Sequence, residues 1–398
     1  MTQQTVAQQV LLGDEAVALG AIHAGITAAY AYPGTPSTEI TQYILNHKAR
    51  EGRPHAAWCA NEKTAVEEAL GTSFAGRRAL VSMKHVGLNV AADPFVNSAL
   101  ISIHGGVVLA VADDPGMHSS QNEQDTRYLT DFAKVMCLEP ANQQEAYEMT
   151  IEAFDLSERF NIPVVLRLVT RLAHSRAVVE VGPARAENPM SKVPDPSSWI
   201  LLPSIARRQW HQLLGQQKDM VEYAEQCRHN PLTLNNDWRG LGVITPGIAR
   251  NYYMEAAEDM GEAPSHLHIG AYPMPVDKIR KLFDHVERVL VLEEGFPFVE
   301  RALRGILPIE KDILGKMNGR VPLEGELNPD IARVALGLEI PEGVSLSNVS
   351  LPNRPPQLCK GCPHGDAYGA IKEALSEYEQ TMVTSDIGCY TLGALPPY

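Results

Sequence analysis

The chain has 398 residues and a mass of 43.6 kDa, which predicts two or three domains rather than one compact core. Its composition, 44% hydrophobic and 21% charged, excludes a disordered chain, a collagen-like repeat and a coiled-coil rod. The net charge of −14 argues against binding to nucleic acid, which needs a basic surface. The longest apolar run, residues 107–112, is far shorter than the ~20 residues of a membrane helix, and no secretory signal opens the chain. We therefore expect a cytoplasmic enzyme without membrane contact.

Helix-patterned and strand-patterned segments alternate through residues 1–175. The patterns predict helices at 14–24, 37–49, 61–74, 88–101 and 143–160, and strands at 28–32, 56–59, 79–83, 107–112 and 163–169. This alternation is typical of a parallel sheet covered by helices on both faces. Ligands of such sheets bind beyond the carboxyl ends of the strands, where the two most irregular loops occur, residues 33–38 and 113–125.

The rest of the chain divides at two segments rich in Pro and Ser, residues 182–203 and 341–356. Between them we predict a helical connector and a second α/β segment, with a helix at 205–225 and strands at 242–245, 266–270 and 289–292. A helix at 366–378 and a strand at 381–385 follow the second segment. One helix and one strand cannot bury enough apolar surface to form a domain. This last piece therefore either docks on its neighbours or begins something longer.

Three of the six cysteines, Cys359, Cys362 and Cys389, cluster near the end of the sequence. Two thiolates separated by two residues can bind one metal centre from a single turn, and a third can come from the next strand end. An iron–sulfur cluster would need a fourth ligand, whereas zinc could take these cysteines with His364. Haem attachment is disfavoured because Pro363 stands where the histidine should follow. The alternative for this cluster is a set of plain thiols in a turn. The isolated Cys59, Cys137 and Cys227 are expected to be ordinary buried or free thiols. Six cysteines are too few for a disulfide scaffold.

Four other segments carry side chains that suit either a ligand or an ordinary structural role. The Tyr-Pro-Gly-Thr-Pro-Ser-Thr-Glu turn at 32–39 could hold a ligand or cap a helix through Ser37 or Thr38. Glu62 opens a helix of small residues, where a carboxylate usually complements the helix dipole. The loops 84–89 and 113–125 could line a pocket or lie in solvent. Walker, Gly-x-Gly-x-x-Gly, His-Glu-x-x-His and Gly-x-Ser-x-Gly motifs are missing from the sequence, which disfavours nucleotide-driven and serine-hydrolase chemistry.

Together, seven segments resemble the large (alpha) subunits of indolepyruvate ferredoxin oxidoreductases, within the thiamine-diphosphate-dependent 2-oxoacid:ferredoxin oxidoreductase family. They are LLGDEAVALGAIHAG, AYPGTPSTEI, NEKTAVEEALGTSFAG, SMKHVGLNVAADP, SSQNEQD, LCKGCPHGDA and SDIGCYTLGALPP. The resemblance covers nearly the whole chain and is weakest at 180–240. It implies an α/β fold with a parallel-sheet pyrimidine-binding domain (1–180), a linker and helical connector (181–239), a transketolase C-terminal-like domain (240–345) and the incomplete beginning of a diphosphate-binding domain (346–398).

The resemblance also implies roles for individual residues. Glu62 matches the glutamate that hydrogen-bonds N1′ of the aminopyrimidine and so favours the imino tautomer, which removes the proton from C2 of the thiazolium. Members that take small oxoacids tend to have an arginine where this chain has Ser119-Ser120-Gln121-Asn122. The remaining assignments are substrate contacts for Thr35 and Gln121, cofactor contacts for Gly34, Asp386, Ile387 and Gly388, and [4Fe-4S] ligation by Cys359, Cys362 and Cys389.

The implied reaction converts an arylpyruvate such as indolepyruvate, coenzyme A and oxidised ferredoxin into the arylacetyl-CoA, CO2 and reduced ferredoxin. A smaller beta subunit is the implied partner, and thiamine diphosphate, Mg²⁺ and iron–sulfur clusters are the implied cofactors. The Gly-Asp-Gly…Asn segment that holds Mg²⁺ in the family is not in the sequence. We therefore expect a fragment that is inactive alone, with the Mg²⁺ site and further clusters beyond residue 398. Another 2-oxoacid oxidoreductase, a non-oxidative thiamine-diphosphate decarboxylase and a non-catalytic docking fragment are the alternatives.

Overall fold

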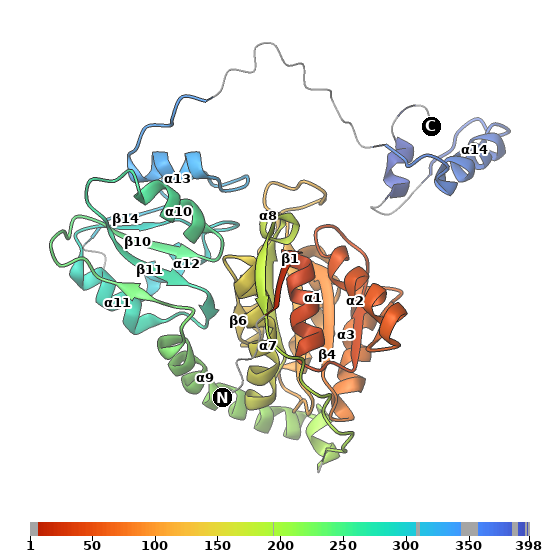
Figure 1. Cartoon of the computed structure of the whole chain (residues 1–398). Helices are drawn as coiled ribbons and strands as arrows, with labels where there is room; N and C mark the ends of the chain where they lie inside the picture. Colours follow the sequence, from red (N-terminus) through yellow and green to blue (C-terminus); the bar gives the residue numbers. More distant parts are fainter. Residues whose placement is uncertain are drawn as a thin grey trace. The chain divides into compact units, whose positions relative to one another are not determined.

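The computed structural model describes residues 7–193, 195–307, 311–343, 357–383, 389–394 and 396. The chain divides into two compact units, residues 1–340 and residues 341–398. In the part of the first unit that the structure describes, the strands form sheets of seven, five and two strands (Figure 1). The seven-stranded and five-stranded sheets are both mostly parallel, so the predicted α/β class is confirmed.

The seven-stranded sheet has the order β12-β6-β7-β5-β4-β2-β3. Its strands are β2 (Ala28–Ala31), β3 (His55–Trp58), β4 (Ala79–Lys84), β5 (Val107–Asp113), β6 (Cys137–Leu138), β7 (Val164–Val169) and β12 (Ala271–Tyr272). All are parallel except β12, which pairs antiparallel with β6. Every residue of β4, β5 and β7 is buried. Burial on both faces explains why these strands are almost continuous apolar runs instead of alternating patterns.

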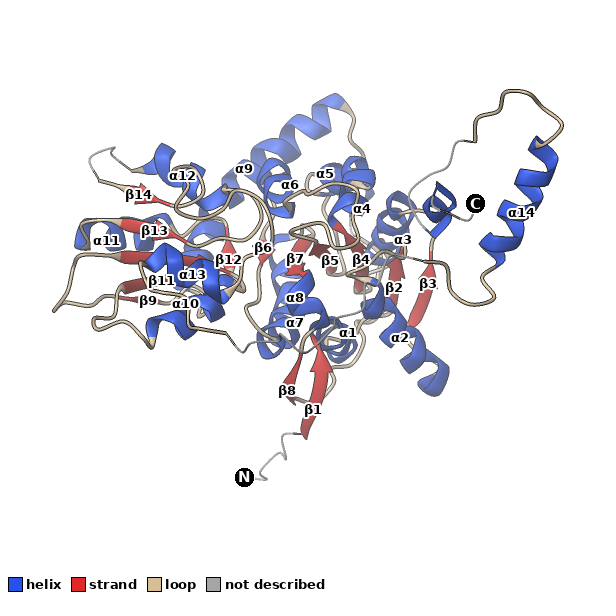
Figure 2. Ribbon diagram, turned by 90° about the horizontal axis from the view of Figure 1, so that it is seen from above, coloured by secondary structure: helices blue, strands red, loops and turns tan. Residues whose placement is uncertain are grey.

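Helices cover both faces of this sheet, as Figure 2 shows from above. One face carries α1 (Gly13–His23), α2 (Thr38–Glu51) and α7 (Gln143–Phe160), and the other carries α3 (Glu62–Phe74), α4 (His85–Val90), α5 (Ala92–Ser98) and α6 (Thr126–Ala133). A short helix, α8 (Thr170–His174), follows β7 and contacts α1. Small residues such as Ala16, Ala18 and Ala21 are fully buried on α1, which lets this helix pack closely along α7.

The five-stranded sheet has the order β14-β13-β10-β11-β9. Its strands are β9 (Leu232–Thr233), β10 (Gly242–Pro246), β11 (Ser265–Ile269), β13 (Val289–Val291) and β14 (Ile313–Leu314). The accompanying helices are α9 (Pro203–Gln226), α10 (Ala249–Ala257), α11 (Val276–His285), α12 (Phe298–Ile306) and α13 (Pro329–Leu336), and a 3₁₀ turn at Pro196–Trp199 precedes α9. Because β12 leaves this half of the unit to join the larger sheet, the two sheets are connected through the backbone.

Several features of the first unit differ from the sequence-based expectation. The predicted helix at 88–101 is two helices, α4 and α5, because Pro94 has no N–H to bond to the carbonyl of Val90 and its ring clashes there. The strands β1 (Ala7–Leu12) and β8 (Arg176–Val181) form an antiparallel pair that the polar sequence did not indicate. The edge strand β12 was not predicted either.

The second unit contains α14 (Pro363–Leu375) and a 3₁₀ helix at Cys389–Ala394. The predicted strand at 381–385 is not observed at residues 381–383, and residues 384 and 385 lie outside the described part.

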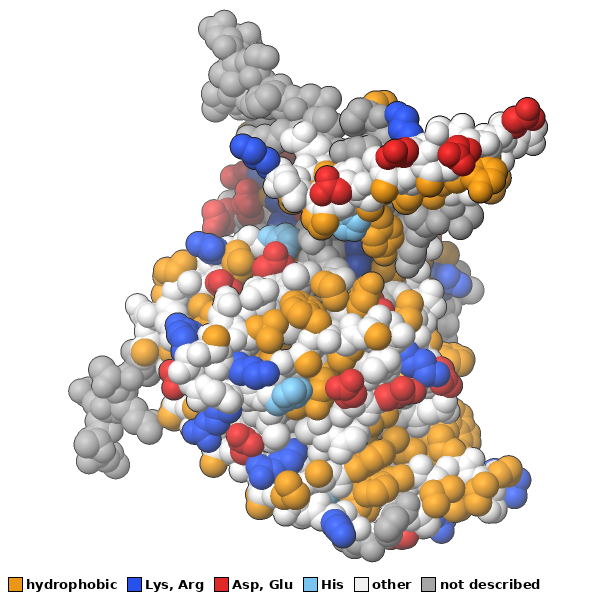
Figure 3. Space-filling model, turned by 90° about the vertical axis from the view of Figure 1, so that its right-hand side faces the viewer, with side chains coloured by type: hydrophobic (Ala, Val, Ile, Leu, Met, Phe, Trp, Pro, Cys, Tyr) orange, Lys and Arg blue, Asp and Glu red, His pale blue; other side chains and the backbone are white. Residues whose placement is uncertain are grey.

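Among the residues described, no helix combines the length and the apolar character that crossing a bilayer requires. On the face drawn in Figure 3, Lys and Arg side chains are interspersed with Asp and Glu side chains and with hydrophobic ones.

Candidate active site

Three segments meet at the carboxyl-terminal edge of the larger sheet. Because β2, β4 and β5 are parallel neighbours, the residues that follow them emerge at the same edge. The hydroxyl of Ser119, after β5, donates a 3.0 Å hydrogen bond to the carbonyl oxygen of Thr35, after β2. The Nζ of Lys84, the last residue of β4, donates a 3.0 Å hydrogen bond to the carbonyl oxygen of Ser119. The two loops predicted to bind a ligand are therefore in contact.

The turn after β2 is closed by its own hydrogen bonds. The N–H of Gly34 donates to the hydroxyl of Thr38 at 2.9 Å, and the hydroxyl of Ser37 donates to the carbonyl of Gly34 at 2.8 Å. Ser37 therefore does not cap α2 with its side chain, contrary to the expectation for a plain capping loop. A Cβ at Gly34 would come within 2.9 Å of Cδ of Lys84, so the lysine chain covers this glycine. Thr35 is exposed at the tip of the turn.

Glu62 is the first residue of α3 and is 8% exposed. The helix begins where the sequence predicted, because the Oδ1 of Asn61 accepts a 2.9 Å hydrogen bond from the N–H of Thr64. Gly87 of α4 faces the carboxyl group, since a Cβ at this position would come within 2.4 Å of Oε1 of Glu62. Only a residue without a side chain leaves room for this carboxylate.

Lys84 is within electrostatic reach of two carboxylates. Burial lowers the pKa of the Lys84 ammonium group, while the negative charges of Asp114 and Glu62 act in the opposite direction. Burial opposes ionisation of Asp114 as well, but its hydrogen bonds and the charge of Lys84 outweigh this effect and lower the pKa of its carboxyl group. The bonds, of 2.7–2.8 Å, come from the N–H of Ser119 and the hydroxyls of Ser120 and Thr170. This edge of the sheet therefore holds fixed charges of both signs.

The structure brings some of the predicted residues together and leaves others apart. Glu62, Gly34 and Thr35 lie at the ends of neighbouring strands, and Gln121 belongs to the loop after β5, where its side chain is exposed. The predicted cofactor contacts Asp386, Ile387 and Gly388 lie outside the described residues. The roles assigned to all of these residues stay predictions.

The three predicted metal-binding cysteines belong to the second unit. Cys359 and Cys389 are exposed and Cys362 is partly buried, with Sγ of Cys362 3.2 Å from Nδ1 of His364. Cys389 is tied to α14, because its carbonyl accepts a 3.4 Å hydrogen bond from the hydroxyl of Tyr368. The three thiols are not among the groups of described side chains whose ligand atoms lie within 4.8 Å of one another. An iron–sulfur cluster does not require its cysteine sulfurs to lie this close together, because its thiolates bind different iron atoms.

A buried ionic network next to this edge was not predicted. Arg167, in the middle of β7, donates to Asp113 at 2.6 Å and to Glu139. Arg127, in α6, donates to Asp125 at 2.5 Å and, across to the smaller sheet, to Glu293 at 3.1 Å. All these side chains are almost completely removed from solvent. The charged residue inside the apolar strand Val-Val-Leu-Arg-Leu-Val was the sequence signal for this network, which fixes both ends of the loop 113–125.

A separate hollow of about 370 Å³ is lined by residues that include His23, Arg53 and Arg185. His23 is the last residue of α1, Arg53 precedes β3, and the N–H of Arg185 donates a 2.7 Å hydrogen bond to the carbonyl of His23. The hollow therefore lies at the amino-terminal edge of the sheet, away from Glu62. Parallel α/β sheets bind ligands at the other edge. We therefore assign the candidate site to the edge that carries Glu62.

Comparison with known proteins places this geometry in a family. The family profile described as pyruvate flavodoxin/ferredoxin oxidoreductase, thiamine diphosphate-binding, matches residues 19–225, which include every part of the candidate site in the first unit. The chain belongs to this family. The predicted membership in the 2-oxoacid:ferredoxin oxidoreductases is thereby confirmed.

Relatives within the family are similar over almost all of this chain. The indolepyruvate oxidoreductase subunit IorA of Methanothermobacter thermautotrophicus is 39% identical over 98% of the chain, which covers 65% of that protein. The IorA subunit of Archaeoglobus fulgidus is 39% identical over 97% of the chain, which covers 64% of that protein. The ketoisovalerate oxidoreductase subunit VorB of M. thermautotrophicus is 26% identical over 40% of the chain. The chain thus spans slightly less than two thirds of the length of the IorA subunits.

Two solved structures share the fold. A 2-oxoglutarate:ferredoxin oxidoreductase from Magnetococcus marinus, with 2-oxoglutarate, coenzyme A and succinyl-CoA bound, has a TM-score of 0.66 at 17% identity and covers 79% of this chain and 63% of its own. A split-gene transketolase, described as an inactive β4 tetramer, has a TM-score of 0.51 at 13% identity and covers 82% of this chain and 97% of its own. The α/β architecture of the family therefore extends through both large sheets.

Proposed function

We propose that this chain is the thiamine-diphosphate-binding part of the large subunit of an indolepyruvate:ferredoxin oxidoreductase. The proposed reaction converts an arylpyruvate such as indolepyruvate, coenzyme A and oxidised ferredoxin into the arylacetyl-CoA, CO2 and reduced ferredoxin. The observation that carries the proposal is the buried carboxylate of Glu62, which faces Gly87 at the ligand-binding edge of the sheet. The similarity to IorA subunits over 98% of the chain supports the choice of substrate class.

The residues at this edge fit the aminopyrimidine ring of thiamine diphosphate. When bound, this cofactor supplies the nucleophile for the 2-oxo carbon and accepts the electron pair left by CO2. Glu62 is the residue that would hold the ring nitrogen N1′, because a buried carboxyl group can share a proton with a ring nitrogen without competition from water. Gly34 would let the cofactor approach the backbone of the turn closely. Asp386, Ile387 and Gly388 stay proposed as further cofactor contacts, as the family resemblance implies.

The remaining residues of the edge position the loops and the substrate. Lys84 holds the backbone of Ser119, and Asp114 holds the hydroxyl of Ser120, so the loop after β5 is fixed next to the turn after β2. Exposed Thr35 and Gln121 are therefore available to contact the arylpyruvate. Lys84 also supplies a positive charge close to the site, which favours a substrate that carries a carboxylate.

We propose that Cys359, Cys362 and Cys389 would hold a [4Fe-4S] cluster, which would supply electron-transfer chemistry. Ferredoxin is the proposed acceptor, and a smaller beta subunit is the proposed partner. We propose Mg²⁺ as the companion of the cofactor diphosphate. All six cysteines are free thiols, which supports a reducing cytoplasmic location. The proposed domains are residues 1–180, 181–239, 240–345 and 346–398, as the family resemblance implies.

The test is the rate of indolepyruvate-dependent ferredoxin reduction by the complete complex of large and beta subunits under anaerobic conditions. We expect Glu62→Gln to lower kcat by at least about 100-fold, the contribution of a positioned proton-transfer group. Glu67→Gln is the matched control, because Glu67 lies on the same helix with 53% of its side chain exposed. The control should react at the wild-type rate.

Other outcomes would point to the other proposed classes. Release of CO2 without reduction of ferredoxin, from a complex that lacks iron and sulfide, would indicate a non-oxidative decarboxylase. An unchanged rate in Glu62→Gln would contradict the catalytic role of Glu62 and favour the alternative that the chain is a non-catalytic docking fragment. Faster turnover of another 2-oxoacid than of indolepyruvate would keep the reaction class and correct the substrate.

A further inference from the structure

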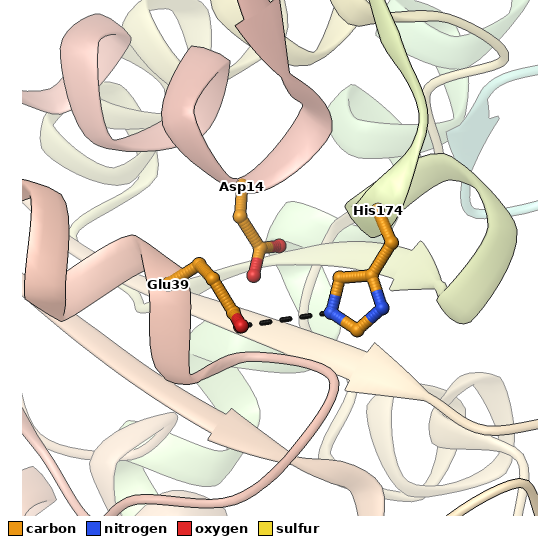
Figure 4. A group of neighbouring side chains, drawn as sticks. All are labelled: Asp14, Glu39 and His174. Atoms are coloured by element: carbon orange, nitrogen blue, oxygen red, sulfur yellow. Dashed lines mark ion pairs between the residues drawn. The ribbon is translucent and has the colours of Figure 1, made fainter. Parts of the chain in front are cut away.

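Three side chains from distant parts of the sequence meet on the face of the larger sheet that α1 and α2 cover, opposite the face that carries α3 (Figure 2). Asp14 belongs to α1, Glu39 to α2 and His174 to α8, and their ligand atoms all lie within 4.8 Å of one another. The Oε2 of Glu39 is 3.6 Å from Nε2 of His174. Figure 4 shows the three side chains pointing toward one another, with the carboxylate of Asp14 next to the Glu39–His174 pair.

The start of α1 is built so that Asp14 points into this cluster. Gly13 lies against the backbone of α8, since its N–H donates a 3.2 Å hydrogen bond to the carbonyl of Ser175 and a Cβ there would come within 2.2 Å of the carbonyl oxygen of Leu172. The next acidic residue, Glu15, caps the helix by accepting a 2.9 Å hydrogen bond from the N–H of Leu12. Glu15 thus caps the helix, whereas Asp14 faces His174.

Asp14 is completely buried, and within the part of the chain that the structure describes neither of its carboxylate oxygens has a hydrogen-bond partner. A buried carboxylate without hydrogen bonds or a cation is strongly unfavourable. A cation held between the three side chains would compensate this charge.

We propose that Asp14, Glu39 and His174 bind a divalent transition-metal ion of the zinc type. Two carboxylate oxygens and one imidazole nitrogen suit Zn²⁺ and its neighbours in the first transition-metal row, whereas Mg²⁺ and Ca²⁺ prefer ligand sets made only of oxygen atoms. Donors on one tetrahedral zinc ion lie about 3.4 Å apart, so ligand atoms that lie within 4.8 Å of one another need to close by at most about 1.4 Å. The side chains of Glu39 and His174 are 42% and 36% exposed, which leaves room for this movement, an entry path and water ligands.

Such an ion would stiffen the turn of the candidate active site. Glu39 directly follows Thr38, whose hydroxyl accepts the hydrogen bond from the N–H of Gly34. An ion that holds Glu39 against α1 and α8 would fix the first turn of α2. The metal site is separate from the residues assigned to thiamine diphosphate, and its existence does not depend on the proposed reaction.

The experiment measures binding of Zn²⁺ and Co²⁺ to the full chain after removal of metal with a chelator. It is performed in the Cys359→Ser/Cys362→Ser/Cys389→Ser background, so that the three proposed cluster ligands cannot provide the site. We expect about one ion per chain, at least tenfold weaker binding in Asp14→Asn and His174→Gln, and wild-type binding in His118→Gln. His118 is the matched control, because its Nε2 lies 3.5 Å from the carboxylate of Glu326 on the surface and it belongs to no three-ligand group among the described residues.

Two additional readouts keep the proposal testable if a variant folds poorly. The Co²⁺ spectrum should lack the intense charge-transfer absorption of thiolate ligands, and Zn²⁺ should raise the Tm of the background protein but not that of His174→Gln. Equal binding by all variants, binding lost only with the cysteines, or no binding would overturn the proposal.

Discussion

Lys84 donates a 3.0 Å hydrogen bond from Nζ to the carbonyl oxygen of Ser119, so the end of β4 holds the loop that follows β5. The same side chain lies against Gly34 in the turn after β2. One lysine therefore joins three strand ends, in a position where the carboxylates of Asp114 and Glu62 influence its charge. A lysine at the end of a buried strand is thus both a structural tie and the positive charge of the candidate site.

Replacement of this lysine should impair the reaction more than the fold. We expect Lys84→Met to lower kcat/KM at least about tenfold, because a hydrogen bond from a charged group contributes about 1.5–3 kcal/mol and its loss frees the Ser119 loop. Lys63→Met is the control, since Lys63 is 45% exposed and pairs with Asp93 on the surface. Steady-state kinetics of the complete complex would measure both, and equal values for the two variants would argue against a role for Lys84.

Gly87 tests the position of the Glu62 carboxylate without changing Glu62. In Gly87→Ala the new Cβ would come within 2.4 Å of Oε1 of Glu62, so the carboxylate must move. We expect at least about a tenfold loss of kcat, although alanine favours a helix over glycine by about 1 kcal/mol. Gly71→Ala, in α3 with open space around the added Cβ, should keep full activity and be slightly more stable. Full activity of Gly87→Ala would show that the carboxylate position is unimportant.

The buried network predicts a large difference between two arginines in neighbouring elements. Arg167→Met would leave the buried carboxylates of Asp113 and Glu139 without their partner, and we expect a loss of about 3–5 kcal/mol in the free energy of unfolding. Arg171→Met breaks a pair with Glu326 in which the arginine is 44% exposed, and should cost at most about 1 kcal/mol. Urea unfolding measures both, and similar losses would refute the importance of the network.

The fold could be predicted where a local pattern determines the structure. The helix Gln143–Phe160 and the strand that begins at Val107 have the predicted limits or nearly so, because their apolar periodicity is strong and caps such as Asn142 mark the ends. The pairing of β1 with β8 and of β12 with β6 joins segments more than 130 residues apart. Tertiary packing rather than local sequence selects such partners.

The candidate site, like the fold, could be predicted only where a local sequence pattern determines the structure. Parallel-strand logic placed the turn at 33–38 and the loop at 113–125 at one edge, and Asn61 marked the helix that starts with Glu62. The lysine tie, the arginine network and the meeting of Asp14 with His174 depend on residues far apart in sequence, for which one sequence offers only indirect signs. A lone Arg in an apolar strand was such a sign.

Glu294 gives the chain a predicted pH dependence of stability. Its side chain is 2% exposed, its Oε1 accepts a 3.0 Å hydrogen bond from the N–H of Leu327, and its Oε2 has no hydrogen-bond partner among the described residues. Burial, which outweighs the charge of Arg167, raises the pKa of the Glu294 carboxyl group from 4.5 to about 7. Between these two values the folded state retains a proton that the unfolded state has lost.

The protonated carboxyl group of Glu294 therefore makes its full contribution to the free energy of unfolding below pH 4.5, and this contribution is lost as the pH rises through 7. Glu294→Gln, which is neutral at every pH and can still accept the bond from Leu327, removes the effect. We expect the free energy of unfolding of this variant, relative to wild type, to rise by about 2–3 kcal/mol between pH 5 and pH 8. Urea titrations at the two pH values measure this difference, and Glu262→Gln, at an exposed position, should show none. The same pH dependence in wild type and Glu294→Gln would mean that the carboxyl group ionises normally in the folded protein.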